Sequence, residues 1–174
     1  MTDHSSIQKL DIPLERDLFI RTLIRELAGV LEEIVGYEDA SGYISLVGQK
    51  IGLWLNDIYC QALGMPRLTR EQVSEVLVDL KHRIQGDFHI IEENEEKIIL
   101  GCNTCPFEEK VIGRQSMCMM TSNVFGYISA QNLGYAKVQL NETIAANSSH
   151  CLVTIFLKPN RESQQAPGRE YFGD

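Results

Sequence analysis

Three stretches in the first half of the chain carry apolar residues at the spacing of an α-helix. The first ends at Gly36, the second covers about 43–63, and the third runs from a capping box at Thr69 to Gly86. The first stripe repeats near every 3.5 residues, which suits packing against another helix in the same domain or in a partner subunit. Its members are Ile20, Leu23, Ile24, Leu27, Val30, Leu31 and Ile34.

After residue 86 the pattern changes to short β-branched runs, which predict two hairpins with a helix at about 115–132 between them. The predicted strands cover 88–91, 97–100, 135–140 and 151–157. The order helix, helix, helix, strand, strand, helix, strand, strand predicts an α+β fold, with an antiparallel sheet and helices on one side of it. Residues 159–174 show no period, so we expect a single domain over 1–158 followed by a flexible tail.

Composition limits the classes of partner. The 174 residues are 44% apolar and 23% charged, which is ordinary for one globular domain. A net charge of −8 argues against nucleic acid as a direct partner, because a phosphate backbone attracts a basic surface. No apolar run approaches the ~20 residues of a membrane span. The chain opens without an apolar signal segment, so we expect a cytoplasmic protein with reduced thiols.

Four of the five cysteines form the candidate chemical site: Cys102, Cys105, Cys118 and Cys151. Thiolates bind zinc or an iron-sulfur cluster, and the Cys-x-x-Cys pair can reach one ion from a tight turn. Cys118 falls in the first turn of a predicted helix, where the helix dipole favours a thiolate. The alternatives are that all four are small buried apolar residues, or that they pair as disulfides. We interpret Cys60, far away in sequence, as a packing residue.

Gly48 and Gly52 lie one turn apart on the second predicted helix, where each lowers helix propensity by about 1 kcal/mol. Close approach of another backbone or of a ligand would offset that cost. We therefore expect an apolar ligand pocket between this helix and the one at 115–132. Its expected lining residues are Trp54, Met120 and Phe125.

Longer motifs add a family resemblance. They are segments 16–20, 40–49, 79–88 and 116–138, together with Cys105-Pro-Phe, Ile144-Ala and Cys151. These residues resemble the methanogen output domain family across almost the whole chain. The resemblance implies a role in bacterial or archaeal signal transduction, either attached to sensor or regulator modules or alone.

The chain is more distantly similar to the four-vinyl-reductase domain superfamily, which shares its fold with a subunit type of the TRAPP tethering complexes. Its phenol- and xylene-responsive sensor domains hold zinc beside a small-molecule pocket through three cysteines and a glutamate. Cys118 and Cys151 match two of those cysteines, the third has no counterpart here, and the glutamate falls near Glu142. Cys102 and Cys105 could supply the missing ligands, so the fourth ligand is open between Cys102 and Glu142.

Taken together, the sequence predicts a non-catalytic signalling module stapled by zinc. We expect a homodimer through the first helix, which binds a small apolar ligand or a signalling protein. No nucleophile elbow and no glycine-rich phosphate loop is present in the sequence. The alternative hypothesis is a redox or gas sensor that holds an iron-sulfur cluster or switches between thiol and disulfide.

Overall fold

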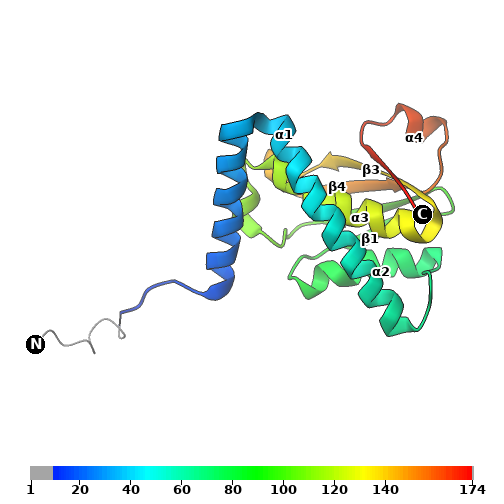
Figure 1. The fold of residues 1–174 in the computed structure, drawn as a ribbon, viewed down its shortest axis with the longest axis horizontal. Helices are drawn as coiled ribbons and strands as arrows, with labels where there is room; N and C mark the ends of the chain where they lie inside the picture. Colours follow the sequence, from blue (N-terminus) through cyan, green and yellow to red (C-terminus); the bar gives the residue numbers. More distant parts are fainter. Residues whose placement is uncertain (1–9, 174) are drawn as a thin grey trace, which may run out of the picture.

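The computed structural model describes residues 10–173, and its first element is one long helix with a bend. Helix α1 (Arg16–Leu63) continues past Gly36, whose φ of 82° and ψ of 164° are not helical. The two halves of α1 diverge from this glycine, the first lying along one side of the body and the second crossing it (Figure 1). The predicted helix end at Gly36 is therefore a bend, and residues 37–42, which the sequence left between two helices, are helical.

The second half of α1 packs directly on helix α3 (Cys118–Leu133) through its two glycines. A Cβ atom at Gly48 would lie 2.8 Å from Cβ of Asn123, and one at Gly52 would lie 3.2 Å from Cα of Val124. The close approach expected from the sequence is thus made by another helix and not by a ligand. This contact offsets the helix propensity that the two glycines lose.

Helix α2 (Arg70–Arg83) begins with the predicted capping box. The Thr69 side chain accepts a hydrogen bond from the backbone N–H of Gln72, whose side chain bonds back to the backbone N–H of Thr69. The apolar face of α2 enters the main core beside α3 and the sheet.

Five strands form one antiparallel sheet in the order β1-β2-β4-β3-β5. The strands are β1 (His89–Glu93), β2 (Lys97–Cys102), β3 (Tyr135–Glu142), β4 (Cys151–Phe156) and β5 (Arg169–Phe172). Helix α3 contacts β3 and β5 as well as α1, so it joins the helical layer to the sheet (Figure 1). The α+β class predicted from the sequence is confirmed.

The expectation of a flexible tail is wrong over most of its length. Residues after 158 form the short helix α4 (Arg161–Gln165) and then β5, which pairs with β3 at the sheet edge. Tyr171 is only 3% exposed, its ring packs against Gly126, and its hydroxyl lies 3.0 Å from Oγ of Ser122. A four-residue strand with one buried side chain is too short to show a period in the sequence.

Between residues 10 and 173, three single-turn 3₁₀ helices join these elements: η2 (Glu108–Val111), η3 (Gln115–Met117) and η4 (Ile144–Ala146). They contribute Val111, Met117 and Ala145 to a second, smaller core that also contains Ala28 of α1. In the stretch from residue 10 to residue 173, no helix is both long and apolar enough to cross a membrane.

Candidate cysteine site

The four predicted cysteines come together in the fold and line one cavity of about 30 Å³. Cys102 ends β2, Cys105 lies in the loop after it, Cys118 begins α3 and Cys151 begins β4. The remaining lining residues are mostly apolar: Phe88, Pro106, Phe107, Val111, Met117, Thr121, Leu140, Thr143 and Val153. Cys60 lies in the main core, as expected for a packing residue.

A short turn places Cys105 close to Cys102. The Asp87 carboxylate accepts hydrogen bonds from the backbone N–H groups of Asn103 and Thr104, at 2.7 Å and 2.6 Å. These bonds hold the loop that joins the two cysteines. They also keep the pKa of Asp87 below its ordinary value, even though partial burial acts in the opposite direction.

Cys102 and Cys151 are direct partners in the ladder between β2 and β4. The Cys102 thiol donates a hydrogen bond to the backbone carbonyl of Thr104 at 3.2 Å, and the interaction of the two sulfur atoms raises the pKa of Cys102 and lowers that of Cys151. The backbone N–H of Ile144 also donates to Sγ of Cys151 at 3.3 Å, which further favours the thiolate there. The negative charge of the pair therefore resides on Cys151.

The other two thiols are held in the neutral form in this structure. Burial raises the pKa of Cys105, and it raises the pKa of Cys118 to about 12. The helix dipole expected to favour a Cys118 thiolate is weak here, because the turn η3 runs directly into α3 and already bonds the backbone N–H of Cys118. Burial outweighs the dipole.

Lys81, which was not predicted from the sequence, extends from α2 toward this site. Lys81 is 5% exposed, and its Nζ donates to Oγ1 of Thr121 at 2.7 Å. The ammonium lies 5.2 Å and 5.1 Å from the ring centroids of Phe88 and Phe125. A signal was present, because Lys81 follows Leu77 by four residues on the apolar face of α2.

Lys81 has an unusual electrostatic environment. Burial lowers its pKa to about 8, while the four cysteines act in the opposite direction. Between residues 10 and 173, no carboxylate forms an ion pair with Lys81, so the groups that can carry a balancing negative charge are the thiols. A buried cation next to four thiols favours at least one of them as a thiolate.

The donor set suits a thiophilic metal, but its present arrangement does not form a ligand shell. Among the described residues, no three Cys, His, Asp or Glu side chains are arranged so that they could hold a metal ion. Metal binding would therefore require rotation of the cysteine side chains. Glu142, the alternative fourth ligand, pairs with His150 at 3.5 Å and lines the neighbouring hollow that Cys118 also reaches, not the cysteine cavity.

The three residues expected to line a ligand pocket are not brought together. Phe125 is fully buried in the main core, and Trp54 is 57% exposed on α1. Met120 lines an apolar groove of about 400 Å³, which lies between the two halves of α1. The tight contact of Gly48 and Gly52 with α3 closes the interface where the sequence placed the pocket.

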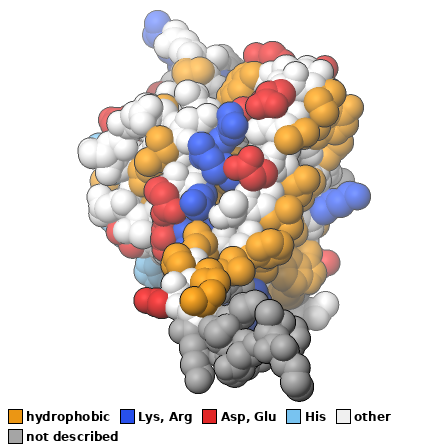
Figure 2. Space-filling model, turned by 90° about the vertical axis from the view of Figure 1, so that its left-hand side faces the viewer, with side chains coloured by type: hydrophobic (Ala, Val, Ile, Leu, Met, Phe, Trp, Pro, Cys, Tyr) orange, Lys and Arg blue, Asp and Glu red, His pale blue; other side chains and the backbone are white. Residues whose placement is uncertain are grey.

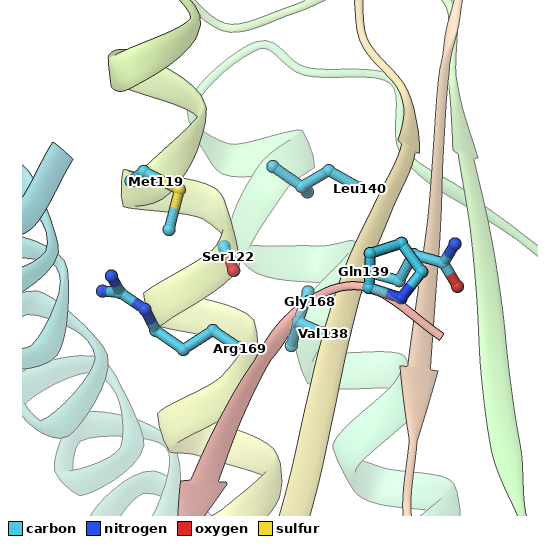
Figure 3. A pocket seen from close by; sticks show the side chains of 8 residues that line it. Met119, Ser122, Val138, Gln139, Leu140, Gly168 and Arg169 are labelled. Atoms are coloured by element: carbon cyan, nitrogen blue, oxygen red, sulfur yellow. The ribbon is translucent and has the colours of Figure 1, made fainter. Parts of the chain in front are cut away.

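Another hollow, of about 330 Å³, lies between α3 and the β3–β5 edge of the sheet (Figure 3). Met119 and Leu140 line it and also line the hollow that contains Cys118 and Glu142. The two hollows therefore adjoin along β3. The hollow between α3 and the β3–β5 edge is lined by apolar side chains together with the polar side chains of Ser122 and Arg169.

Comparison with solved structures shows that the fold occurs elsewhere. The chain is similar to a trafficking protein particle complex subunit 3 from Naegleria fowleri, which was crystallised covalently bound to palmitic acid. The TM-score is 0.54 and the identity 11%, over 81% of this chain and 96% of that one. At this identity the similarity concerns the fold alone, and it agrees with the fold relationship expected from the sequence.

No curated protein matches the chain. The sequence profile of methanogen output domain 1 matches residues 23–156, a range that contains most of α1 and all four cysteines of the site. The resemblance noted in the sequence is thereby confirmed. The chain belongs to the methanogen output domain 1 family, and this membership indicates a role in signal transduction.

Proposed function

We propose that the protein is a non-catalytic signalling module in which the chemical state of the cysteine cavity controls the first half of α1. One observation carries the proposal. The segment 106–117, which joins Cys105 to Cys118, is also the part of the body that holds the first half of α1. A change at the cysteines would therefore reach this helix through a single short segment.

Arginine side chains make most of the polar contacts between α1 and this segment. Nη1 of Arg25 donates to the backbone carbonyls of Lys110 and Ile112, at 2.5 Å and 2.7 Å. Nη1 of Arg21 lies 2.8 Å from the Glu108 carboxylate. The bonds of Arg25 follow the backbone path of the segment, so they would break or shift if that path changed.

Arg114 makes a third connection from the segment back to α1. Its guanidinium lies 3.3 Å from the Glu32 carboxylate and packs so tightly on Gly29 that a Cβ there would lie 2.7 Å from it. Beside it, Val111 and Met117 share the smaller core with Ala28 and also line the cysteine cavity. The same side chains thus contact both the cavity and the helix.

Zinc is the occupant that the donor set favours. Four thiolates around one Zn²⁺ would carry a net charge of −2, and the buried Lys81 ammonium would offset part of it. Such an ion would supply a structural cross-link between β2, β4, the Cys105 loop and α3. An iron-sulfur cluster on the same thiols is the alternative metal occupant, and its visible absorbance would identify it.

A thiol/disulfide switch is the second candidate, and the register of Cys102 with Cys151 favours it. Cα atoms of directly opposed residues in an antiparallel pair lie roughly 4.5–5.5 Å apart, which is within the range of disulfides. Oxidation would remove the thiol proton of Cys102 and the Cys151 thiolate that balances Lys81. This would also change the cavity against which residues 106–117 pack.

Metal analysis combined with hydrogen exchange tests the proposal. The full chain is prepared anaerobically, its zinc and iron content is measured, and amide exchange is followed before and after chelation. We expect one zinc per chain and, after chelation, about tenfold faster exchange in residues 16–35, or ~1.4 kcal/mol of local stability. Residues 43–63, which pack on α3, should change little.

Two variants sharpen the experiment. Arg25→Gln should uncouple the helix, so that exchange in 16–35 is fast with and without zinc, whereas Cys60→Ser should behave like the wild type. Stoichiometric zinc with no change in 16–35 would refute the transmission. If the protein contains no metal and only oxidation changes amide exchange in residues 16–35, the result would support the disulfide switch and not zinc.

A further inference from the structure

The first half of α1 carries an apolar stripe that nothing in the described structure covers. Five residues follow each other at alternating spacings of three and four, the pattern of a coiled-coil seam. They are Ile20, Leu23, Leu27, Val30 and Ile34, and they are 45%, 46%, 62%, 51% and 75% exposed. The body of the domain packs instead on another face of this helix, through Arg21, Arg25 and Ala28.

A groove runs beside this stripe, between the two halves of α1. It has a volume of about 400 Å³, and all of its lining residues are apolar. They are Ile24, Leu27, Ala28, Leu31, Ile44, Val47, Ile51, Phe107, Met117 and Met120. Apolar side chains gather in a band on the face of the molecule shown in Figure 2, next to charged ones. Val47 and Trp54, which are 50% and 57% exposed, extend the apolar surface along the second half of α1.

We propose that this surface binds a second copy of the chain, with the stripe of each protomer entering the groove of the other. The surface contains both a ridge and a groove of apolar character, as a two-fold symmetric interface requires. The proposal is independent of what occupies the cysteine cavity.

The extent of the surface supports a protein partner over a small ligand. About half of each large side chain is exposed along the stripe, and the same holds for Phe19, Val47 and Trp54. The combined exposed area of these side chains is comparable to the roughly 800 Å² per partner that a standard protein interface buries. Monomeric proteins rarely expose a contiguous apolar patch larger than a few hundred Å².

The charges beside the stripe favour a parallel over an antiparallel pair of helices. Glu26 and Glu33 lie on one flank, whereas Ile24 and Leu31 lie on the flank that faces the groove. In a parallel pair of helices, the glutamate flank of one helix meets the apolar flank of the other. The glutamates of one protomer then lie beside Ile24 and Leu31 of the other. Like charges are then kept apart, which an antiparallel pair would not achieve.

Sedimentation of the full chain over a range of concentrations up to about 200 µM tests the proposal, because protomer concentration sets the fraction of dimer. We expect a dimer for the wild type. Ile34→Glu and Leu27→Glu should each weaken dimerisation by about 100-fold or more, since each buries a charge in the interface. Both side chains are largely exposed in the monomer, so circular dichroism should show an intact fold.

Ile84→Glu is the matched control, because Ile84 is 53% exposed at the end of α2, outside the stripe and the groove. It should leave the dimer unchanged. A wild-type chain that is monomeric throughout would overturn the proposal, and uptake of a fluorescent apolar dye by that monomer would assign the groove to a small ligand. A dimer that persists in both α1 variants would also overturn it.

Discussion

Cys102 and Cys151 face each other across neighbouring antiparallel strands, where the β2–β4 ladder reaches the cysteine cavity. The interaction of the two sulfur atoms raises the pKa of Cys102 and lowers that of Cys151, so a thiolate is favoured at Cys151, in the neighbourhood of the buried Lys81 ammonium. This pair can enter a metal site together or form a disulfide. It therefore gives the first test of the chemistry in the cavity.

Mild oxidation of the metal-free protein should join Cys102 to Cys151 in preference to any other pair. We expect a mass decrease of two hydrogens, a single cross-linked peptide after digestion, and an increase of ~2–4 kcal/mol in the free energy of unfolding. Cys60→Ser should oxidise in the same way, while Cys151→Ser should not. A bond that forms mainly between Cys105 and Cys118 would contradict the ladder register.

Lys81→Met should destabilise the zinc-bound protein more than the metal-free protein. When the thiolates hold zinc, the ammonium offsets their charge, so the variant should lower the free energy of unfolding by ~1–3 kcal/mol. After chelation fewer thiolates remain, with Cys151 as the favoured one, so the ammonium balances less charge and methionine should cost less stability than in the zinc form. Urea unfolding of both forms measures the difference. Lys158→Met, at an exposed lysine, is the control, and stabilisation by Lys81→Met in both forms would argue against thiolates in the cavity.

Most of the secondary structure and the identity of the candidate thiols could be predicted from the sequence, because both depend on local patterns. The capping box at Thr69 and the hairpin strands were found where expected, and the four cysteines lie together. The bend at Gly36 was read as a helix end, since a glycine that ends a helix and one that bends it have the same local pattern.

Other features depend on contacts between distant segments and left weaker signals. Strand β5 is held by Tyr171 against α3 and by pairing with β3, and its own four residues contain too little information to predict it. Lys81 was missed because a single lysine on an apolar face normally extends to solvent. The pocket was misplaced because Gly48 and Gly52 indicate close approach without indicating by what.

The close contact at Gly48 predicts a destabilising alanine. Its Cβ would lie 2.8 Å from Cβ of Asn123 and 3.3 Å from the Met120 carbonyl oxygen, so α1 and α3 would have to separate. Gly48→Ala should therefore cost ~1–3 kcal/mol despite its better helix propensity. Gly42→Ala, in the same helix with no heavy atom within 4 Å, should stabilise by ~0.5–1 kcal/mol. Thermal melting measures both effects. If the melting temperatures of the two variants shifted in the same direction, the close packing of Gly48 on α3 would be contradicted.

Alkaline unfolding should reveal the burial of Tyr171 and with it the order of the C-terminal strand. Burial raises the pKa of Tyr171 from 10.0 to about 12. Between these values the unfolded chain loses the tyrosine proton while the folded chain keeps it, so the free energy of unfolding falls as pH rises. The expected loss from this group is ~2–3 kcal/mol by pH 12 and is absent below pH 10.

Tyr171→Phe removes this titration. It should be less stable than the wild type at pH 8 by about 1 kcal/mol, because the hydrogen bond with Ser122 is lost, and the difference should shrink as pH rises above 10. The exposed Tyr43 provides the control variant Tyr43→Phe, which should follow the wild type. Tyr59 and Tyr135, whose pKa values are also raised, are present in every protein and cancel in the comparison. If the wild type and Tyr171→Phe lost stability in parallel above pH 10, the side chain would be open to solvent and β5 would not pack against α3.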